Sequence, residues 1–147
     1  MTTPPSPDKP SAVVPRPLPA TNRDTHPYWT GGKEGQLLIF RCRHCQYYVH
    51  PPVRFCPECE SREVEPEAVS GRGVVTSFTV NHKQWLPNLP VPYVVALVSI
   101  AEQEDVRLVC NIVNCEVDDV HIDMSVSVLF EQHEDLWVPL FQPEQTQ

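Results

Sequence analysis

The chain has 147 residues, a net charge of −8 and 17 prolines. This length allows one ordinary domain, or a small metal module and one compact barrel. No apolar run approaches the ~18 residues that span a bilayer, and residues 1–20 lack the apolar core of a secretory signal. We therefore expect a soluble, cytoplasmic protein whose thiols stay reduced.

The first 22 residues are rich in proline, serine, threonine and alanine, and seven of the 17 prolines lie in the first twenty positions. Such a segment buries too little apolar surface to offset the entropy lost on ordering. We predict a disordered or extended tail over residues 1–22. A proline-rich ligand for a groove in another protein is the alternative.

Residues 23–36 are predicted to form a short helix. Asp24 or Thr25 can act as its N-cap, and the glycines that follow keep it short. The helix presents two large apolar side chains, Tyr28 and Trp29. These either pack back onto the chain or dock on a partner, since aromatic residues are common anchors of protein interfaces.

Two Cys-x-x-Cys pairs separated by ten residues dominate the next segment: Cys42, Cys45, Cys56 and Cys59. Each pair forms a tight turn, so the two pairs can deliver four thiolates to one tetrahedral ion. Zinc is favoured over a rubredoxin-like iron, because a zinc ion held by four sulfurs carries no redox chemistry and serves as a cross-link. A pair of disulfides is the other alternative. We predict a rubredoxin-like zinc ribbon over residues 37–62 with a structural Zn²⁺.

The two turns lack the glycine that often follows the second cysteine and accepts a positive φ. Gln46 and Glu60 occupy these positions, so the sequence leaves the turn geometry open. The ribbon is also locally basic. Its arginines form either a solvated face or a contact for an anionic ligand: Arg41, Arg43, Arg54 and Arg62.

After Ser61 the sequence becomes a series of short β-rich segments without a long helix. The predicted strands are residues 64–69, 74–80, 93–100, 107–113, 125–130 and 136–141. Gly71 and Gly73 suit a bend at a barrel corner, and Pro139 restricts the last strand to an edge or an end. This pattern indicates a mainly β fold with an OB-fold barrel over residues 63–143. A β-sandwich is the alternative.

Catalytic motifs such as G-x-S-x-G, a phosphate loop and H-E-x-x-H are absent from the sequence. Four histidines lie on separate segments: His50, His82, His121 and His133. Cys110 has no basic neighbour that would activate it, and we interpret Cys110 and Cys115 as small buried apolar residues. We therefore expect no catalytic residue.

Zinc ribbons and OB barrels both occur in proteins that bind nucleic acids. Residues 72–143 contain ten acidic residues and three lysines or arginines, and such a charge repels a phosphate backbone. Binding of single-stranded nucleic acid is therefore an alternative rather than the main hypothesis. Electron transfer at a tetrathiolate iron is a third hypothesis.

A zinc ribbon followed at once by an OB-like barrel resembles the acyl-CoA-associated zinc-ribbon/OB-fold family, long described as a domain of unknown function. The resemblance covers roughly residues 27–143. It rests on the order and spacing of ten stretches: Tyr28-Trp29, Glu34-Gly35, Leu37-Leu38, Arg41–Cys45, His50–Arg54, Cys56–Cys59, Ser70–Gly73, Ser77–Val80, Pro92–Ala96 and Pro139–Phe141.

Members of this family resemble non-catalytic subunits of thiolase-fold enzymes, which are thiolases or aldolases that cleave steroid-CoA side chains. Others are joined to MaoC-type enoyl-CoA hydratases. The resemblance implies an accessory subunit in a hetero-oligomer, with acyl-CoA at the shared interface and no catalytic residue of its own. The candidate partner-binding residues are Tyr28, Trp29, Trp85 and Leu86. The candidates for coenzyme A phosphates, on charge alone, are Arg41, Arg54 and Lys83.

Overall fold

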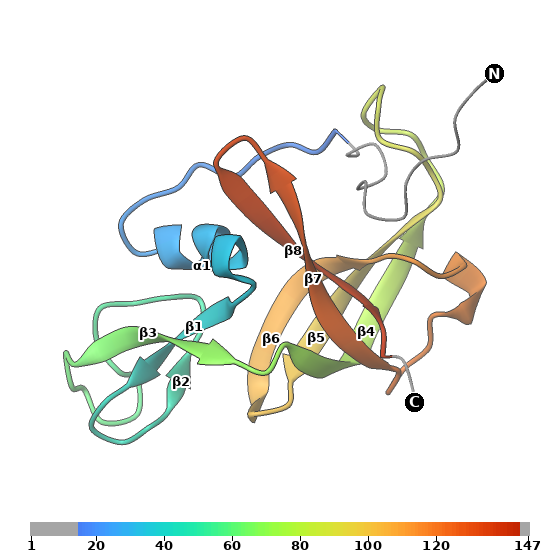
Figure 1. Ribbon diagram of the computed structural model, residues 1–147. Helices are drawn as coiled ribbons and strands as arrows, with labels where there is room; N and C mark the ends of the chain where they lie inside the picture. Colours follow the sequence, from blue (N-terminus) through green and yellow to red (C-terminus); the bar gives the residue numbers. More distant parts are fainter. Residues whose placement is uncertain (1–14, 145–147) are drawn as a thin grey trace.

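The computed structural model describes residues 15–144 (Figure 1). A short helix α1 (His26–Thr30) and a 3-10 helix η1 (Gly31–Glu34) are followed by strands and one further 3-10 turn, η2 (Val117–Asp119). The strands are β1 (Leu37–Cys42), β2 (Tyr48–Val49), β3 (Val64–Val69), β4 (Arg72–Asn81), β5 (Tyr93–Ile100), β6 (Gln103–Ile112), β7 (Ser125–His133) and β8 (Leu136–Pro143). Every helix within residues 15–144 is too short to cross a bilayer.

Strands β4 to β8 form a closed barrel in the order β4-β5-β6-β8-β7, with β7 paired back onto β4. All neighbours are antiparallel except β6 and β8, which are parallel and pair at Ile112 and Phe141. Alternate side chains point inward and fill the barrel, among them Val98, Leu108 and Phe141. This topology confirms the predicted OB-fold and shows that the β-sandwich alternative was wrong.

The short pairing between β6 and β8 leaves a seam beside which α1 and η1 lie (Figure 1). Gly32 approaches this part of the barrel so closely that an added Cβ would lie 2.5 Å from Cβ of Trp137. Pro139 lies where β8 pairs with β7 and not with β6, as expected for a residue that cannot donate a backbone hydrogen bond. The predicted short helix is therefore present, and it packs on the barrel.

The ribbon is a three-stranded sheet in the order β2-β1-β3. Residues 64–69 fall within the predicted barrel, but β3 pairs with β1 along its whole length, from Leu37 with Val69 to Cys42 with Val64. Strand β2 has only two residues and occupies the other edge, so β1 has a free edge for β3. The second cysteine turn reverses the chain and returns it to this edge. The barrel therefore begins at Arg72, not at residue 63.

The predicted disordered or extended tail is described only in part. Residues 1–14 lie outside the described residues, but residues 15–22 run without regular structure beside the β7–β8 hairpin (Figure 1). The guanidinium of Arg16 donates from Nε to Glu131 and from Nη1 to Asn111, each at 2.8 Å. Its side chain is only 14% exposed. The chain is therefore anchored from Arg16 onward.

Candidate metal centre and partner surface

The two cysteine turns have the same backbone geometry. The amide of Gln46 donates to the carbonyl of Cys42 at 3.0 Å, and the amide of Glu60 donates to the carbonyl of Cys56 at 2.9 Å. Gln46 and Glu60 have φ values of +69° and +64°. Both residues thus adopt the left-handed conformation that glycine favours, although neither is glycine.

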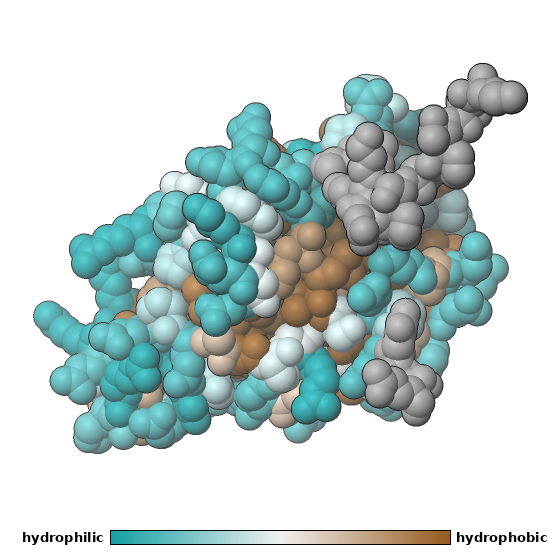
Figure 2. Space-filling view, in the orientation of Figure 1, coloured by the Kyte–Doolittle hydropathy of each residue, from teal (hydrophilic) through white to brown (hydrophobic). Residues whose placement is uncertain are grey.

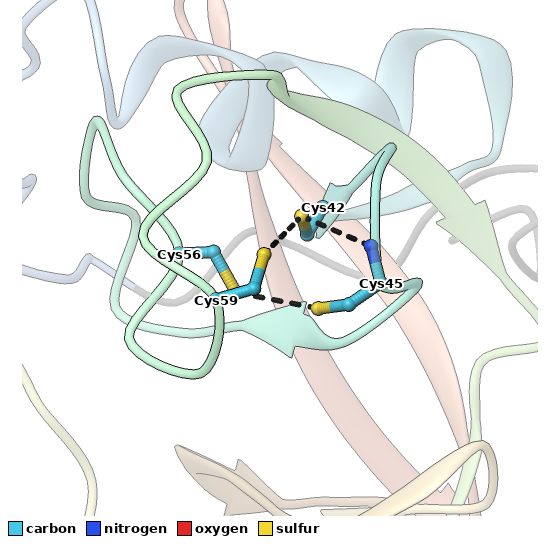
Figure 3. A group of neighbouring side chains, drawn as sticks. All are labelled: Cys42, Cys45, Cys56 and Cys59. Carbon is cyan, nitrogen blue, oxygen red and sulfur yellow. Dashed lines mark hydrogen bonds between the residues drawn. The ribbon is translucent and has the colours of Figure 1, made fainter.

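The four cysteine sulfurs converge on one point between the turns (Figure 3). All four lie within 4.8 Å of one another, with 3.6 Å between Sγ of Cys42 and Cys59 and 3.5 Å between Sγ of Cys45 and Cys56. A tetrahedral zinc with Zn–S bonds of about 2.3 Å requires sulfurs about 3.8 Å apart. The residues present therefore fit a closed Zn²⁺ site.

Local hydrogen bonds favour the thiolate form of one of the four sulfurs, that of Cys42, whereas burial and hydrogen bonds to neighbouring sulfurs raise the pKa of Cys45 to about 12 and also raise that of Cys59. The amide of Cys45 donates to Sγ of Cys42 at 3.4 Å. This hydrogen bond is the main cause that lowers the pKa of Cys42 to about 6. In the second turn the amide of Glu58 donates to Sγ of Cys56, also at 3.4 Å.

The ribbon is joined to the barrel through the start of β6. The side-chain amide of Gln103 donates to the carbonyl of Tyr48 and accepts from its amide, both at 2.9 Å. The Tyr47 hydroxyl donates to Asp105. Tyr48, Leu37 and Ile39 also belong to the same buried cluster as the barrel core. No local sequence pattern indicates this role of Gln103, because it lies 55 positions from Tyr48.

The four candidate partner-binding residues lie in different environments. Tyr28 packs against the barrel core, and burial of its hydroxyl raises its pKa. Trp29 lines a cavity of about 300 Å³ together with Val109, whose side chain is 70% exposed. Trp85 and Leu86 are 65% and 40% exposed on the loop between β4 and β5. Tyr28 therefore contributes to the fold and also lines the cavity beside Trp29, whereas Trp85 and Leu86 are exposed.

Apolar surface gathers in the middle of one face of the molecule, over β7 and β8 and beside α1 (Figure 2). Both strands carry half-buried apolar side chains: Val128, Leu129, Phe130, Trp137 and Val138. Exposed apolar areas of this kind are typical of surfaces that another protein covers.

The three candidate phosphate-binding cations do not form one cluster. Arg41 donates to Glu67 at 2.8 Å and lies 4.5 Å from the centre of the Tyr48 ring. Lys83 lies 4.1 Å from the centre of the Trp85 ring on the far loop. Only Arg54 lines a groove that also contains other arginines, which are Arg23 and Arg62.

Comparison with known proteins gives one matching family model for the ribbon and one for the barrel. The family model described as "ChsH2, rubredoxin-like zinc ribbon domain" matches residues 29–65, and "ChsH2, C-terminal OB-fold domain" matches residues 66–131. A "DUF35 domain-containing scaffold protein" of Methanocaldococcus jannaschii is 33% identical over 71% of this chain and 74% of its own length. The chain belongs to the ChsH2/DUF35 family. The predicted family and the predicted structural zinc are thereby confirmed.

Two further relatives carry the names of enzymes. A solved structure titled "Ltp2-ChsH2(DUF35) aldolase" is 37% identical, with a TM-score of 0.76 over 86% of this chain and 98% of that chain. A "Probable enoyl-CoA hydratase alpha subunit" of Thermomonospora curvata is 38% identical over 92% of this chain but only 41% of its own length. The chain thus spans about two fifths of that subunit.

Proposed function

We propose that this chain is a non-catalytic accessory subunit that binds a thiolase-fold acyl-CoA enzyme, either a thiolase or a steroid side-chain aldolase, and borders its acyl-CoA site. The observation that carries the proposal is the match along 98% of a chain in the structure titled as a ChsH2(DUF35) aldolase. The scaffold description of the jannaschii relative supports the same role. Reduced zinc-binding thiols are consistent with a cytoplasmic location.

The described surface supports a partner-binding role. Trp85 and Leu86 are exposed on a loop whose geometry is fixed locally, since the indole N–H of Trp85 donates to Asn81 at 3.1 Å. An ordered tryptophan loses little conformational freedom on docking, and tryptophan is frequent among energetic hot spots. The apolar area over β7 and β8 provides a second contact region (Figure 2).

The titratable side chains of the ribbon and the barrel support a non-catalytic role. Burial raises the pKa of the Cys110 thiol to about 12, which keeps it protonated. Burial lowers the pKa of His50, and His133 pairs with Glu131 at 2.6 Å. These groups lie on separate elements and do not combine a nucleophile with a base.

A MaoC-type hydratase is the second candidate partner, because the Thermomonospora relative is described as an enoyl-CoA hydratase subunit. The chain would then support hydration of an enoyl-CoA rather than cleavage or formation of a carbon–carbon bond. Binding of nucleic acid has less support, since residues 72–143 contain ten acidic and three basic residues.

Co-expression with a thiolase-fold protein encoded beside this chain tests the proposal. We expect one peak in size-exclusion chromatography and an enzyme that is more soluble or active in the complex. Trp85→Ala should weaken the complex about 30-fold if this residue is a hot spot. Ile122→Ala is the matched control, because Ile122 is 51% exposed on another loop.

Two outcomes would reject the thiolase-fold partner. One is separate elution of the two proteins together with full activity of the enzyme alone. The other is a stable complex with a MaoC-type protein that hydrates an enoyl-CoA, which would favour the second candidate. Thioester turnover by the isolated chain would contradict a non-catalytic role.

A further inference from the structure

A cavity of about 440 Å³ lies at the end of the barrel where β4 and β7 begin and β5 ends (Figure 1). Four charged side chains line it, three carboxylates and one guanidinium: Glu104, Asp123, Glu144 and Arg72. The carboxylates belong to the start of β6, to the segment before β7 and to the residue after β8. The fold therefore gathers acidic groups that the sequence keeps apart.

The negative charge of this cavity is not compensated by ion pairs. Within residues 15–144, none of its four charged side chains takes part in one. Glu67 of the ribbon behaves differently, since it pairs with Arg41 at 2.8 Å. Three carboxylates and one guanidinium leave the cavity with a net negative charge, which favours a cationic ligand.

A buried hydroxyl in the same cavity is an independent sign of a ligand. Ser99 lines the cavity and is only 2% exposed. Within residues 15–144, its Oγ is the single buried side-chain oxygen or nitrogen without a hydrogen-bond partner. The hydroxyl of Thr76 on the neighbouring strand is paired, since it donates to the carbonyl of Leu97 at 3.1 Å. An unpaired buried hydroxyl is unfavourable, so we expect Ser99 to meet a polar group of the ligand.

The spread of the carboxylates indicates the class of cation. In the described part of the chain, only the four cysteines bring three or more metal-ligating atoms together, so these carboxylates do not converge on one ion. An extended cation with several ammonium groups matches separated carboxylates better. The lining also includes Val74, Ile100 and Ala101, which suit alkyl chains between the charges. The volume lies within the range of about 300–1,000 Å³ that is usual for small-molecule sites.

We infer that this cavity binds a linear alkylammonium ligand, in which two or three ammonium groups are joined by short alkyl chains. The carboxylates of Glu104, Asp123 and Glu144 accept hydrogen bonds from the ammonium groups. One further ammonium N–H donates to Oγ of Ser99, and the alkyl chains pack on the apolar lining. Free polyamines and the lysine side chains of another protein share this chemistry. The cavity shares no lining residue with the cavity beside Trp29, and its ligand can be tested without the proposed enzyme partner.

Calorimetric titration of the full zinc-loaded chain at low salt provides the first test. Spermidine and putrescine should both bind, with spermidine the tighter, and Mg²⁺ at the same charge concentration should not displace spermidine. Glu104→Gln and Asp123→Asn should each raise the Kd for spermidine about tenfold. Asparagine tolerates the left-handed backbone of Asp123, whose φ is +68°. The matched controls are Glu116→Gln and Asp118→Asn, because both acids are exposed and lie outside the cavity.

Ser99→Ala separates ligand binding from a structural role. This variant should raise the Kd for spermidine about fivefold, because the ligand loses one hydrogen bond. Its Tm without ligand should equal or exceed that of the wild type, because the substitution removes an unpaired buried hydroxyl. A lower Tm together with an unchanged Kd would mean that the hydroxyl is paired within the protein, and would overturn the inference.

A short peptide with two lysines, blocked at both ends, distinguishes the two sources of the cation. Peptide binding at least as tight as that of spermidine, with the same losses in the variants, assigns the cavity to lysines of another protein. Tighter binding of spermidine assigns it to a free polyamine. Three results would overturn the inference: no binding of either probe, displacement of spermidine by Mg²⁺, or an unchanged Kd in both Glu104→Gln and Asp123→Asn. Circular dichroism and zinc content verify that each variant folds.

Discussion

The ribbon and the barrel are stabilised by different means. In the barrel, inward-facing side chains such as Val98, Leu108 and Phe141 are fully buried and supply most of the apolar core. The ribbon sheet has a two-residue strand at one edge, and two of its most buried side chains are cysteines, Cys42 and Cys56. The barrel therefore depends on burial of apolar surface, and the smaller ribbon depends on a metal cross-link.

The two modules are nevertheless joined tightly. Leu37 and Ile39 of β1 extend the barrel core into the ribbon, and Gln103 holds the backbone of Tyr48. The proposed role as an adaptor would benefit from this arrangement, because the ribbon and the loop between β4 and β5 are fixed relative to each other.

Removal of zinc should have the largest effect and should separate the two modules. Structural zinc sites of this type contribute about 10–16 kcal/mol of binding free energy, more than the stability of most small domains. Chelation, or Cys56→Ser, should therefore unfold residues 37–69 and leave β4 to β8 folded. Amide hydrogen exchange resolved by residue measures this directly.

The control for zinc removal is Cys115→Ser, since Cys115 is half-buried and lies outside the sulfur cluster. This variant should retain one zinc and native exchange in the ribbon. Protection of the ribbon amides from exchange after full removal of zinc would contradict this prediction. It would show that the apolar contacts of β1 are sufficient to keep the ribbon folded.

Truncation of the barrel core should have the second largest effect. Phe141 has no exposed surface and pairs with both β6 and β7. Phe141→Ala should lower the free energy of unfolding by about 3–5 kcal/mol, because it leaves a cavity. Urea unfolding followed by tryptophan fluorescence measures the loss, and the zinc content of the folded protein should stay at the wild-type value. A loss below about 1 kcal/mol would indicate that the seam collapses around the cavity.

The sequence predicted what depends on local spacing. Cys42 and Cys45 lie in one turn, so their spacing indicated the metal site without knowledge of the fold. The pairing of β3 with β1 and the contact of Gln103 with Tyr48 join segments that are far apart in the sequence, and no periodicity encodes such a choice of partner. The sequence also did not predict the backbone conformation of Gln46. Its φ is positive because the turn around the cysteines imposes this conformation against the ordinary preference of glutamine.

Loosening the junction between the modules should have an intermediate effect. Gln103→Ala removes two hydrogen bonds to Tyr48 and leaves its backbone groups unpaired in a partly buried position. We expect a loss of about 1–3 kcal/mol and faster amide exchange in the ribbon than in the barrel. Gln132→Ala is the control, because Gln132 donates to a backbone carbonyl in an exposed hairpin. Equal exchange rates in both variants would mean that the shared apolar core alone holds the modules together.

The ion pair between Arg41 and Glu67 should have the smallest effect, and its pH dependence distinguishes it from the metal. The hydrogen bond from Arg41 lowers the pKa of Glu67 below 4.5, so the pair stabilises the folded state above that pH and is lost as the pH falls through the lowered pKa. Because the Glu67 side chain is 31% exposed, Glu67→Gln should cost about 0.2–1 kcal/mol.

The loss of folding free energy caused by Glu67→Gln should stay constant as the pH falls from about 8 to about 6. The stability that depends on zinc should decrease over the same range, because the cysteines must release protons to bind the metal. Thermal unfolding of both proteins at several pH values measures the difference. Glu65→Gln is the matched control, because Glu65 pairs with Arg43 but is 64% exposed and should contribute less. A cost of Glu67→Gln that follows the zinc affinity would instead mean that Arg41, which also donates to the carbonyl of Gln46 at 2.8 Å, acts by shaping the first cysteine turn.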